Sequence, residues 1–180
     1  SYQRQIDELA RGFIEAFAEA NQSAAPSLPD IPGLFTYSGA STVPPSGSLV
    51  DGLAGAIKIN PNVDPSTGGN FRLLRDGSIG DPGNPAYTYN ASGATGFATR
   101  ILGLIDGIDA QRSFDGNAGL STSASVSDFA AASSGWLEDL RQKASADADF
   151  SGTLVDRSYD ALSRATGVNL DEEMAALLDV

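Results

Sequence analysis

Residues 125–166 read SVSDFAAASSGWLEDLRQKASADADFSGTLVDRSYDALSRAT, and this proline-free stretch decides the fold that we predict. Apolar residues recur in it at spacings of three and four, which is the period of an amphipathic helix. Much of the apolar seam is formed by Val126, Phe129, Trp136, Leu140, Ala144, Leu154, Leu162 and Ala165, and it is widened by Leu137, Val155 and Tyr159. A helix of this length extends about 60 Å. We therefore expect either one long helix or one that is broken near residues 148–152.

A second amphipathic helix is predicted at residues 2–21. Its apolar face is formed by Ile6, Leu9, Phe13, Phe17 and Ala20, and the acidic residues Asp7, Glu8, Glu15 and Glu19 lie largely on the opposite side. Burying one such phenylalanine contributes about 1.5–3 kcal/mol, so the apolar face needs a covering partner. We expect this face to pack along the 125–166 helix.

The middle of the chain is predicted to be rich in loops. Residues 22–48 contain five prolines. Proline fixes φ and lacks the backbone N–H that a helix needs. A helical turn is expected at 49–56, a short strand at 56–60, and a strand or helical turn at 71–75. Helical periodicity returns at 95–114, although two internal glycines each weaken that helix by about 1 kcal/mol relative to alanine.

Together these segments predict a mainly α fold, an elongated antiparallel helical bundle with a small α+β or irregular inserted lobe. The predicted parts are a helical rod domain formed by 1–29 and 119–168, a loop-rich lobe at 30–118, and the start of a truncated terminal helix at 169–180.

Composition excludes several classes of function. The formal net charge is −12, from 23 acidic and 11 basic residues, and the only lysines are Lys58 and Lys143. Phosphate contacts need clustered Lys and Arg, so we expect no binding to nucleic acid or to an anionic membrane surface. The chain has no Cys and no His, which excludes thiol nucleophiles, disulfides, Cys/His zinc sites and Ser-His-Asp triads. A general base would have to be a carboxylate, a lysine or a tyrosine.

Three acidic groupings could carry chemistry, and each has a plainer structural explanation. Residues 147–152 match the opening of a calcium loop, with glycine at the sixth position, but the twelfth position lacks the bidentate Glu. The consecutive acids at 171–173 would splay apart on a helix, so they suit its positive N-terminal end better than a metal ion. Asp106 and Asp109 near Tyr87 could form a glycosidase pair, although nothing in the sequence singles out a carboxylate with a raised pKa.

The closing run at 166–178, TGVNLDEEMAALL, resembles the C-terminal signature of the bacterial flagellar hook-associated protein 1 family, the hook–filament junction proteins. Further segments similar to that family are IDELA at 6–10, followed by Phe13, Phe17 and Asn21, then PGLF at 32–35 and IKINP at 57–61. The order of these segments matches the family along most of the chain, whereas residues 38–118 depart from it in length and sequence.

This resemblance implies a structural protein without enzymatic activity and without a cofactor. Proteins of the family leave the cell through the flagellum's own type III secretion channel, without a cleaved signal peptide. They assemble as a ring beneath the filament, with their terminal helices in an inner coiled-coil tube. The implied partners are copies of the chain, the hook protein and the second junction protein, with a dedicated export chaperone as a further candidate. The chain would be an extracellular part of the flagellum that lacks both terminal regions of the family's longer protein.

The residues expected to pack or to assemble lie on the apolar seams: Ile6, Leu9, Phe13, Phe17, Phe129, Trp136, Leu140, Leu154, Leu170, Met174 and Leu177. Such seams form the core of a protein by default, and the sharper hypothesis is that part of each packs on neighbouring subunits. Two other functions stay open. One is a secreted carboxylate-dependent hydrolase similar to a muramidase, and the other is a calcium-binding adhesin-like module.

Overall fold

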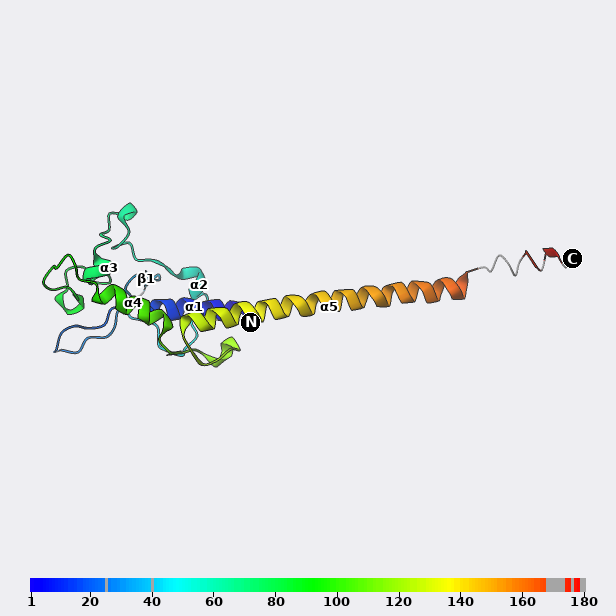
Figure 1. Ribbon diagram of the computed structural model, residues 1–180, viewed down its shortest axis with the longest axis horizontal. Helices are drawn as coiled ribbons and strands as arrows, with labels where there is room; N and C mark the ends of the chain where they lie inside the picture. Colours follow the sequence, from blue (N-terminus) through cyan, green and yellow to red (C-terminus); the bar gives the residue numbers. More distant parts are fainter. Residues whose placement is uncertain (25, 40, 168–173, 176, 179–180) are drawn as a thin grey trace. The chain divides into compact units, whose positions relative to one another are not determined.

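The computed structural model describes residues 1–24, 26–39, 41–167, 174–175 and 177–178, and its regular structure is mainly α (Figure 1). The helices are α1 (Tyr2–Ala16), α2 (Leu53–Ala56), α3 (Leu73–Asp76), α4 (Thr99–Asp109) and α5 (Val126–Thr166), with short 3-10 turns at Pro65–Thr67, Pro85–Tyr87 and Gly116–Ala118. The strands are β1 (Phe35–Thr36), β2 (Lys58–Ile59), β3 (Arg112–Ser113) and β4 (Ser123–Ala124). They form two antiparallel pairs, β1 with β2 and β3 with β4.

The chain divides into two compact units, Ser1–Gly135 and Trp136–Val180, and the division falls within α5. In the first unit α1 lies between two apolar clusters. One cluster consists of Phe114, Ala118, Ala124 and Phe129, with Leu9 and Leu120 packed against it. The other consists of Ala10, Ile14 and Leu53, covered by partly buried side chains of the 35–57 region. The core is therefore built around a single helix, and the loops gain their order by packing on it.

The first turns of α5 pack antiparallel to α1 inside the first unit. Ser133 donates its hydroxyl to Gln5 Oε1 at 2.9 Å, and Phe129 packs in the cluster that Leu9 covers. Two turns further along α1, a Cβ added at Gly12 would stand 3.3 Å from Val126. The position on α1 rises as the position on α5 falls, so the two helices run in opposite directions. The absence of a side chain at Gly12 lets them approach closely.

Several predicted elements are confirmed. The helix expected at 125–166 forms as α5 and runs without a break through 148–152. The strand expected at 56–60 appears as β2, paired with β1. The helical turn expected at 49–56 forms as α2, and the 71–75 segment contains the helical turn α3 rather than a strand.

The prediction of a helix at 2–21 was wrong at its end. α1 ends at Ala16, and Phe17 follows with φ −107° and ψ 17°. Beyond it Glu19 forms an antiparallel bridge with Ile31, with N···O distances of 2.8 and 3.0 Å. The carbonyl of Phe17 accepts a hydrogen bond from the amide of Leu34. These long-range backbone bonds replace the helical ones, because tertiary pairing overrides a weak local preference.

The helix predicted at 95–114 was too long at both ends. Only α4, Thr99–Asp109, forms, and Arg112 and Ser113 pair with β4 as the strand β3. Phe114 leaves the helical pattern altogether and stacks on Phe129, with ring centroids 4.0 Å apart. Stacking in the core stabilises this residue more than continuation of a glycine-weakened helix would.

Candidate assembly surfaces and the polar core of α1

The acidic face of α1 is buried, contrary to the expectation from its sequence pattern. Asp7, Glu8 and Arg11 are fully buried, whereas the predicted apolar face is only half-buried. The expectation that the acids lie opposite the packing face was therefore wrong. Asp7 explains how such burial is stabilised, because its two carboxylate oxygens accept from the amides of Gly52 and Ala54 at 3.0 and 2.9 Å. These bonds hold the start of α2 against α1.

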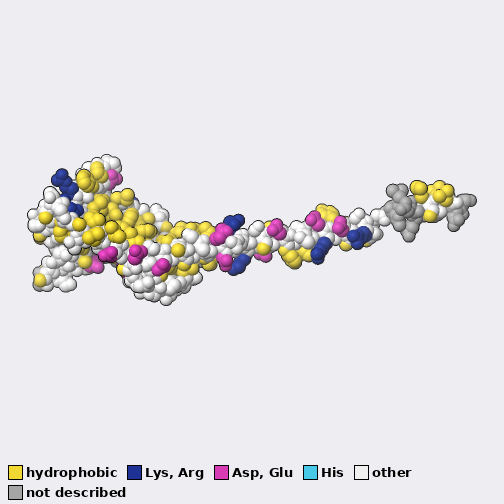
Figure 2. Space-filling view, viewed as in Figure 1, with side chains coloured by type: hydrophobic (Ala, Val, Ile, Leu, Met, Phe, Trp, Pro, Cys, Tyr) yellow, Lys and Arg dark blue, Asp and Glu magenta, His cyan; other side chains and the backbone are white. Residues whose placement is uncertain are grey.

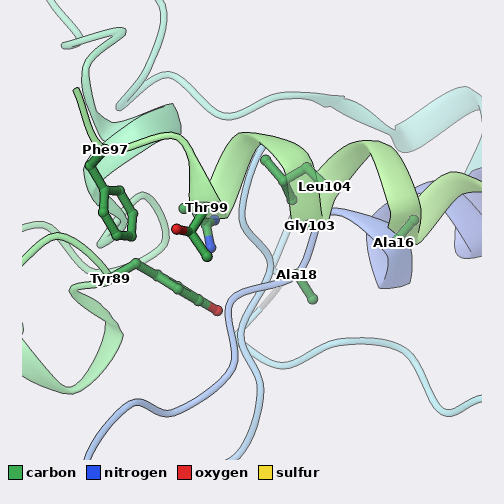
Figure 3. Close-up of a pocket in the computed structure, with 8 residues that line it drawn as sticks. Ala16, Ala18, Tyr89, Phe97, Thr99, Gly103 and Leu104 are labelled. Carbon is green, nitrogen blue, oxygen red and sulfur yellow. The ribbon is translucent and has the colours of Figure 1, made fainter.

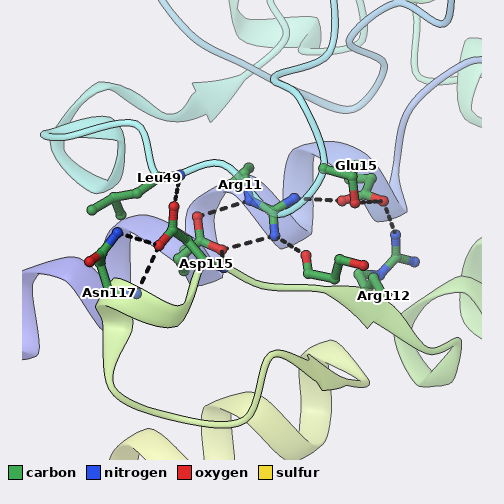
Figure 4. Close-up of polar contacts among 9 residues, drawn as sticks. Arg11, Glu15, Leu49, Arg112, Asp115 and Asn117 are labelled. Carbon is green, nitrogen blue, oxygen red and sulfur yellow. Dashed lines mark hydrogen bonds and ion pairs between the residues drawn. The ribbon is translucent and has the colours of Figure 1, made fainter.

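Arg11 is the centre of a buried ion network (Figure 4). Its Nε and Nη2 donate to the two oxygens of Glu8 at 2.9 and 3.0 Å, and its Nη1 donates to Glu15 at 2.7 Å. Nη2 also donates to the carbonyl of Ser113 at 2.5 Å. The guanidinium lies over the ring of Phe114, 5.4 Å from its centroid. Bidentate pairing of this kind compensates for the removal of both charges from water.

Further polar contacts extend this network to the loops. The amide of Asp115 donates to Glu8 at 2.8 Å, and the Asp115 carboxylate accepts from the amide of Leu49 at 3.0 Å. Hydrogen bonds from the backbone amides of Asn117 and Leu49 lower the pKa of Asp115. Segments more than sixty residues apart in the sequence are thus joined through carboxylates. These bonds hold the 49–54 and 113–117 loops against α1.

A second buried ion pair joins Glu19 to α4. Arg100 Nη2 donates to Glu19 Oε1 at 3.1 Å, and the amide of Gly80 donates to Oε2 at 2.8 Å. The Arg100 guanidinium stacks 4.0 Å above the ring of Tyr89. Burial raises the pKa of Glu19, and the hydrogen bonds from the 78–80 backbone and the charge of Arg100 oppose that shift. No pattern in the local sequence indicates this perturbed carboxyl group.

A hollow of about 290 Å³ lies beside this pair (Figure 3). It is lined by Ala16, Ala18, Tyr89, Phe97, Thr99, Arg100, Gly103 and Leu104. Phe97 and Tyr89 lie at one end of it, and the backbone of α4 closes one side. No carboxylate lines this hollow, and Glu19 is itself fully buried behind Arg100. The hollow therefore offers no carboxylate that could act as a base on a ligand.

The carboxylates that act on Tyr87 are not those of Asp106 and Asp109, the pair that the sequence suggested. The carboxylates whose charges raise the pKa of Tyr87, after burial itself, are those of Asp81, Asp30 and Glu19. The Tyr87 hydroxyl donates to the carbonyl of Pro29 at 2.8 Å, and the carboxylate of Asp109 accepts from the hydroxyl of Ser127. A carboxylate-dependent hydrolase gains no support from these contacts.

The calcium-loop hypothesis is contradicted, since residues 147–152 are helical throughout. A calcium loop has to leave the helix so that its side chains converge on the ion. Within the part of the chain that the structure describes, no group of three or more acidic residues is placed to hold a metal ion.

In the second unit, α5 exposes the apolar seam that the sequence predicts (Figure 2). The exposed fractions are 49% for Leu140, 48% for Leu154 and 58% for Leu162, and Val155 and Tyr159 are also exposed. Leu154, Val155, Ser158, Tyr159 and Leu162 line a shallow hollow of about 270 Å³ on the helix surface. We call Leu140, Leu154, Val155, Tyr159 and Leu162 the α5 seam. Neighbouring exposed apolar side chains, as at Leu154, Val155, Tyr159 and Leu162, are a feature of interaction surfaces.

The residues predicted to pack or assemble fall into two groups. Ile6, Leu9, Phe13 and Phe17 are half-buried and Phe129 is buried, all within the first unit. In the second unit Trp136 is half-buried, and Leu140, Leu154, Met174 and Leu177 are exposed. Leu170 lies outside the described residues, as does most of the helix start predicted at 169–180.

The sequence analysis did not predict the buried polar set of Asp7, Glu8, Arg11, Glu19 and Arg100. The spacing of Glu8, Arg11 and Glu15 signals ion pairs on a helix, but it carries no sign of burial.

Comparison with protein-family models, with curated proteins and with solved structures found no match for this chain. Among the described residues, no helix is both long enough and apolar enough to cross a membrane.

Proposed function

We propose that this chain is a structural subunit that assembles through the α5 seam with copies of itself and with neighbouring subunits. The observation that carries the proposal is the exposure of large apolar side chains along the second unit of α5. A helix in water gains most of its stability from packing of its apolar face. A seam left uncovered over several turns is therefore expected to be covered by another helix in the working assembly.

The energy available at the α5 seam is large enough for this role. Full burial of a leucine, valine or tyrosine side chain contributes about 1.5–3 kcal/mol. Five such side chains would therefore contribute several kcal/mol even when each is only partly covered. Association costs of about 4–15 kcal/mol oppose this gain, so stable assembly needs more than one copy of the contact. A ring or tube of many subunits supplies such repetition.

The setting we propose is the junction between hook and filament of the bacterial flagellum. This part of the proposal rests on the resemblance of 166–178 and of the opening helix to the hook-associated protein 1 family. The elongated antiparallel bundle belongs to the same proposal, with the α5 seam paired to neighbouring helices. Export through the flagellar channel, an extracellular location, and contacts with the hook protein, the second junction protein and an export chaperone also follow from it.

The proposal is tested in a flagellated bacterium whose only copy of this gene carries Leu154→Ser with Leu162→Ser. We expect the protein to be secreted into the medium while filaments fail to grow on the hooks, as seen by electron microscopy. The matched control is Asp160→Ser, an exposed position outside the α5 seam, which should leave filaments normal. Normal filaments in the seam variant would refute assembly through α5. Normal filaments after deletion of the gene would refute the junction role.

A further inference from the structure

α4 buries a charged side chain and exposes several large apolar ones. Arg100 is the one buried residue of Thr99–Asp109, whereas Leu102 and Ile105 have exposed fractions of 58% and 56% and Ile101 is also exposed. α4 faces the rest of the first unit through Arg100, through the half-buried Leu104 and Ile108, and through Gly107, which lies against the carbonyl of Ala16. Ile101, Leu102 and Ile105 are left on the outside.

The outward side of α4 is also acidic. Asp106 and Asp109 are exposed in its last turn, and their helical spacing places them beside Leu102 and Ile105. Negative charge at the C-terminal end of a helix opposes the macrodipole, where a cation would be favourable. The Asp109 carboxylate accepts from a neutral partner, the hydroxyl of Ser127, at 3.0 Å. We call Ile101, Leu102, Ile105, Asp106 and Asp109 the α4 face.

A surface of the opposite character lies elsewhere on the first unit. In β2, Lys58 and Ile59 are both exposed, and Phe71 and Arg72 are exposed ahead of α3. The exposed fractions are 56% for Ile59 and 62% for Phe71. The amide of Asn70 donates to the carbonyl of Asn62 at 2.8 Å, which closes the loop between the two segments. We call these four residues the basic face.

The cations of the basic face are not used in the ion pairs of the first unit. Among the described residues, those pairs are made by Arg11, Arg75, Arg100 and Arg112. Lys58 and Arg72 each stand next in sequence to a large exposed apolar side chain, Ile59 and Phe71, in a chain whose net charge is −12. The basic face therefore matches the α4 face in both respects: it offers apolar area, and it offers the charge that α4 lacks.

We propose that the α4 face of one copy docks on the basic face of a second copy of this chain. The inference rests on the proposed function, because it names the contact by which neighbouring first units meet. Two different surfaces make the contact, so it is heterologous, and repeated heterologous contacts close into a ring when the rotation permits. The apolar side chains provide the affinity. The charges select the partner surface and its orientation, as exposed ion pairs contribute little affinity themselves.

The contact is tested on the 180-residue chain by sedimentation velocity across a concentration series, with two charge-reversing variants. Asp106→Lys and Arg72→Glu should each weaken self-association at least about tenfold, because like charges then face each other. An equimolar mixture of the two variants should recover association, since the lysine of one then meets the glutamate of the other. Lysine near the end of α4 favours the helix, so unfolding would not explain the loss. The matched control, Asp160→Lys on α5, makes the same charge change outside both faces.

The outcomes separate this inference from the proposed function. Recovery in the mixture, and not in either variant alone, supports the contact between α4 and the basic face. A wild-type chain that stays monomeric up to about 1 mM, or a mixture that fails to recover, overturns it. Association that is abolished by Leu154→Ser but unaffected by the two reversals also overturns it, while leaving assembly through the α5 seam intact. Association that survives Leu154→Ser and is lost on charge reversal supports the contact between the α4 face and the basic face independently of the α5 seam.

Discussion

Arg11 in α1 and Arg141 in α5 form the same ion pair in opposite surroundings. Each donates through Nε and Nη2 to both oxygens of the glutamate three residues before it, Glu8 or Glu138, at 2.6–3.0 Å. The side chains of Arg11 and Glu8 are fully buried, whereas those of Arg141 and Glu138 are 70% and 50% exposed. The local sequence pattern is the same. The surrounding loops, rather than the helix, therefore decide whether such a pair stabilises the fold.

The comparison predicts a large difference in stability between two arginine substitutions. Arg11→Ala leaves Glu8 buried without its cation, and breaking a buried pair in this way costs about 3–5 kcal/mol. Arg141→Ala should leave the free energy of unfolding unchanged within error, because its pair is in water. Urea denaturation of both variants, followed by circular dichroism, measures the two effects. Equal losses would show that burial is not what distinguishes the pairs.

The same contrast applies to the apolar residues of α5. Phe129→Ala removes a buried ring that stacks on Phe114, and such truncations cost about 3–5 kcal/mol. Leu154→Ala lies on the exposed α5 seam and should change the free energy of unfolding by about 0.5 kcal/mol or less. Thermal and urea unfolding of the two variants at low protein concentration provide the measurement. A loss at Leu154 as large as that at Phe129 would mean that the α5 seam is already covered within the chain.

The sequence was a good guide to α5 because many periodic residues agree along forty positions, so no single contact can overturn the pattern. It was a poor guide to the end of α1. There Phe17 and Glu19 exchange their helical hydrogen bonds for bonds to Leu34 and Ile31, and such partners are invisible in the local sequence.

The buried acids of α1 could not be predicted for a related reason. The charge of Asp7 is stabilised by amides about forty-five residues away, at Gly52 and Ala54. From hydropathy alone a carboxylate is expected to be exposed to water. Its burial is stabilised only when the folded loops bring hydrogen-bond donors to it. The exposure of the α5 seam and of the α4 face is likewise a property of the three-dimensional structure, since periodicity shows that a face is apolar and not what covers it.

Asp7 provides a smaller test of the buried polar face. Asp7→Ala removes the buried acceptor of two amide hydrogen bonds, which costs about 1–3 kcal/mol when donors are left unsatisfied. The neighbouring Asp51→Ala, at an exposed carboxylate in the same loop, should have no measurable effect. Urea denaturation gives the stabilities, and amide hydrogen exchange at Gly52 and Ala54 should accelerate in the Asp7 variant alone. Unchanged exchange at these two amides would contradict the assigned role of Asp7.

The protonation of Glu19 gives the smallest effect, which is seen in the pH dependence of stability. Burial raises its folded-state pKa above the ordinary value of 4.5. In the window just above pH 4.5 the folded chain therefore binds a proton that the unfolded chain does not, and the free energy of unfolding rises as the pH falls through that window. Asp76 and Asp115, whose pKa values are lowered from 3.8, act in the opposite sense and at lower pH than this window.

Glu19→Gln removes the pH-dependent contribution of Glu19 and also leaves Arg100 without its counter-charge. Because an arginine stays charged at every pH of interest, that loss is a constant offset. Urea denaturation at several values between pH 7 and 4.5 should then show a flatter profile in the variant. Parallel profiles in the two proteins would mean that burial beside Arg100 does not raise the pKa of Glu19.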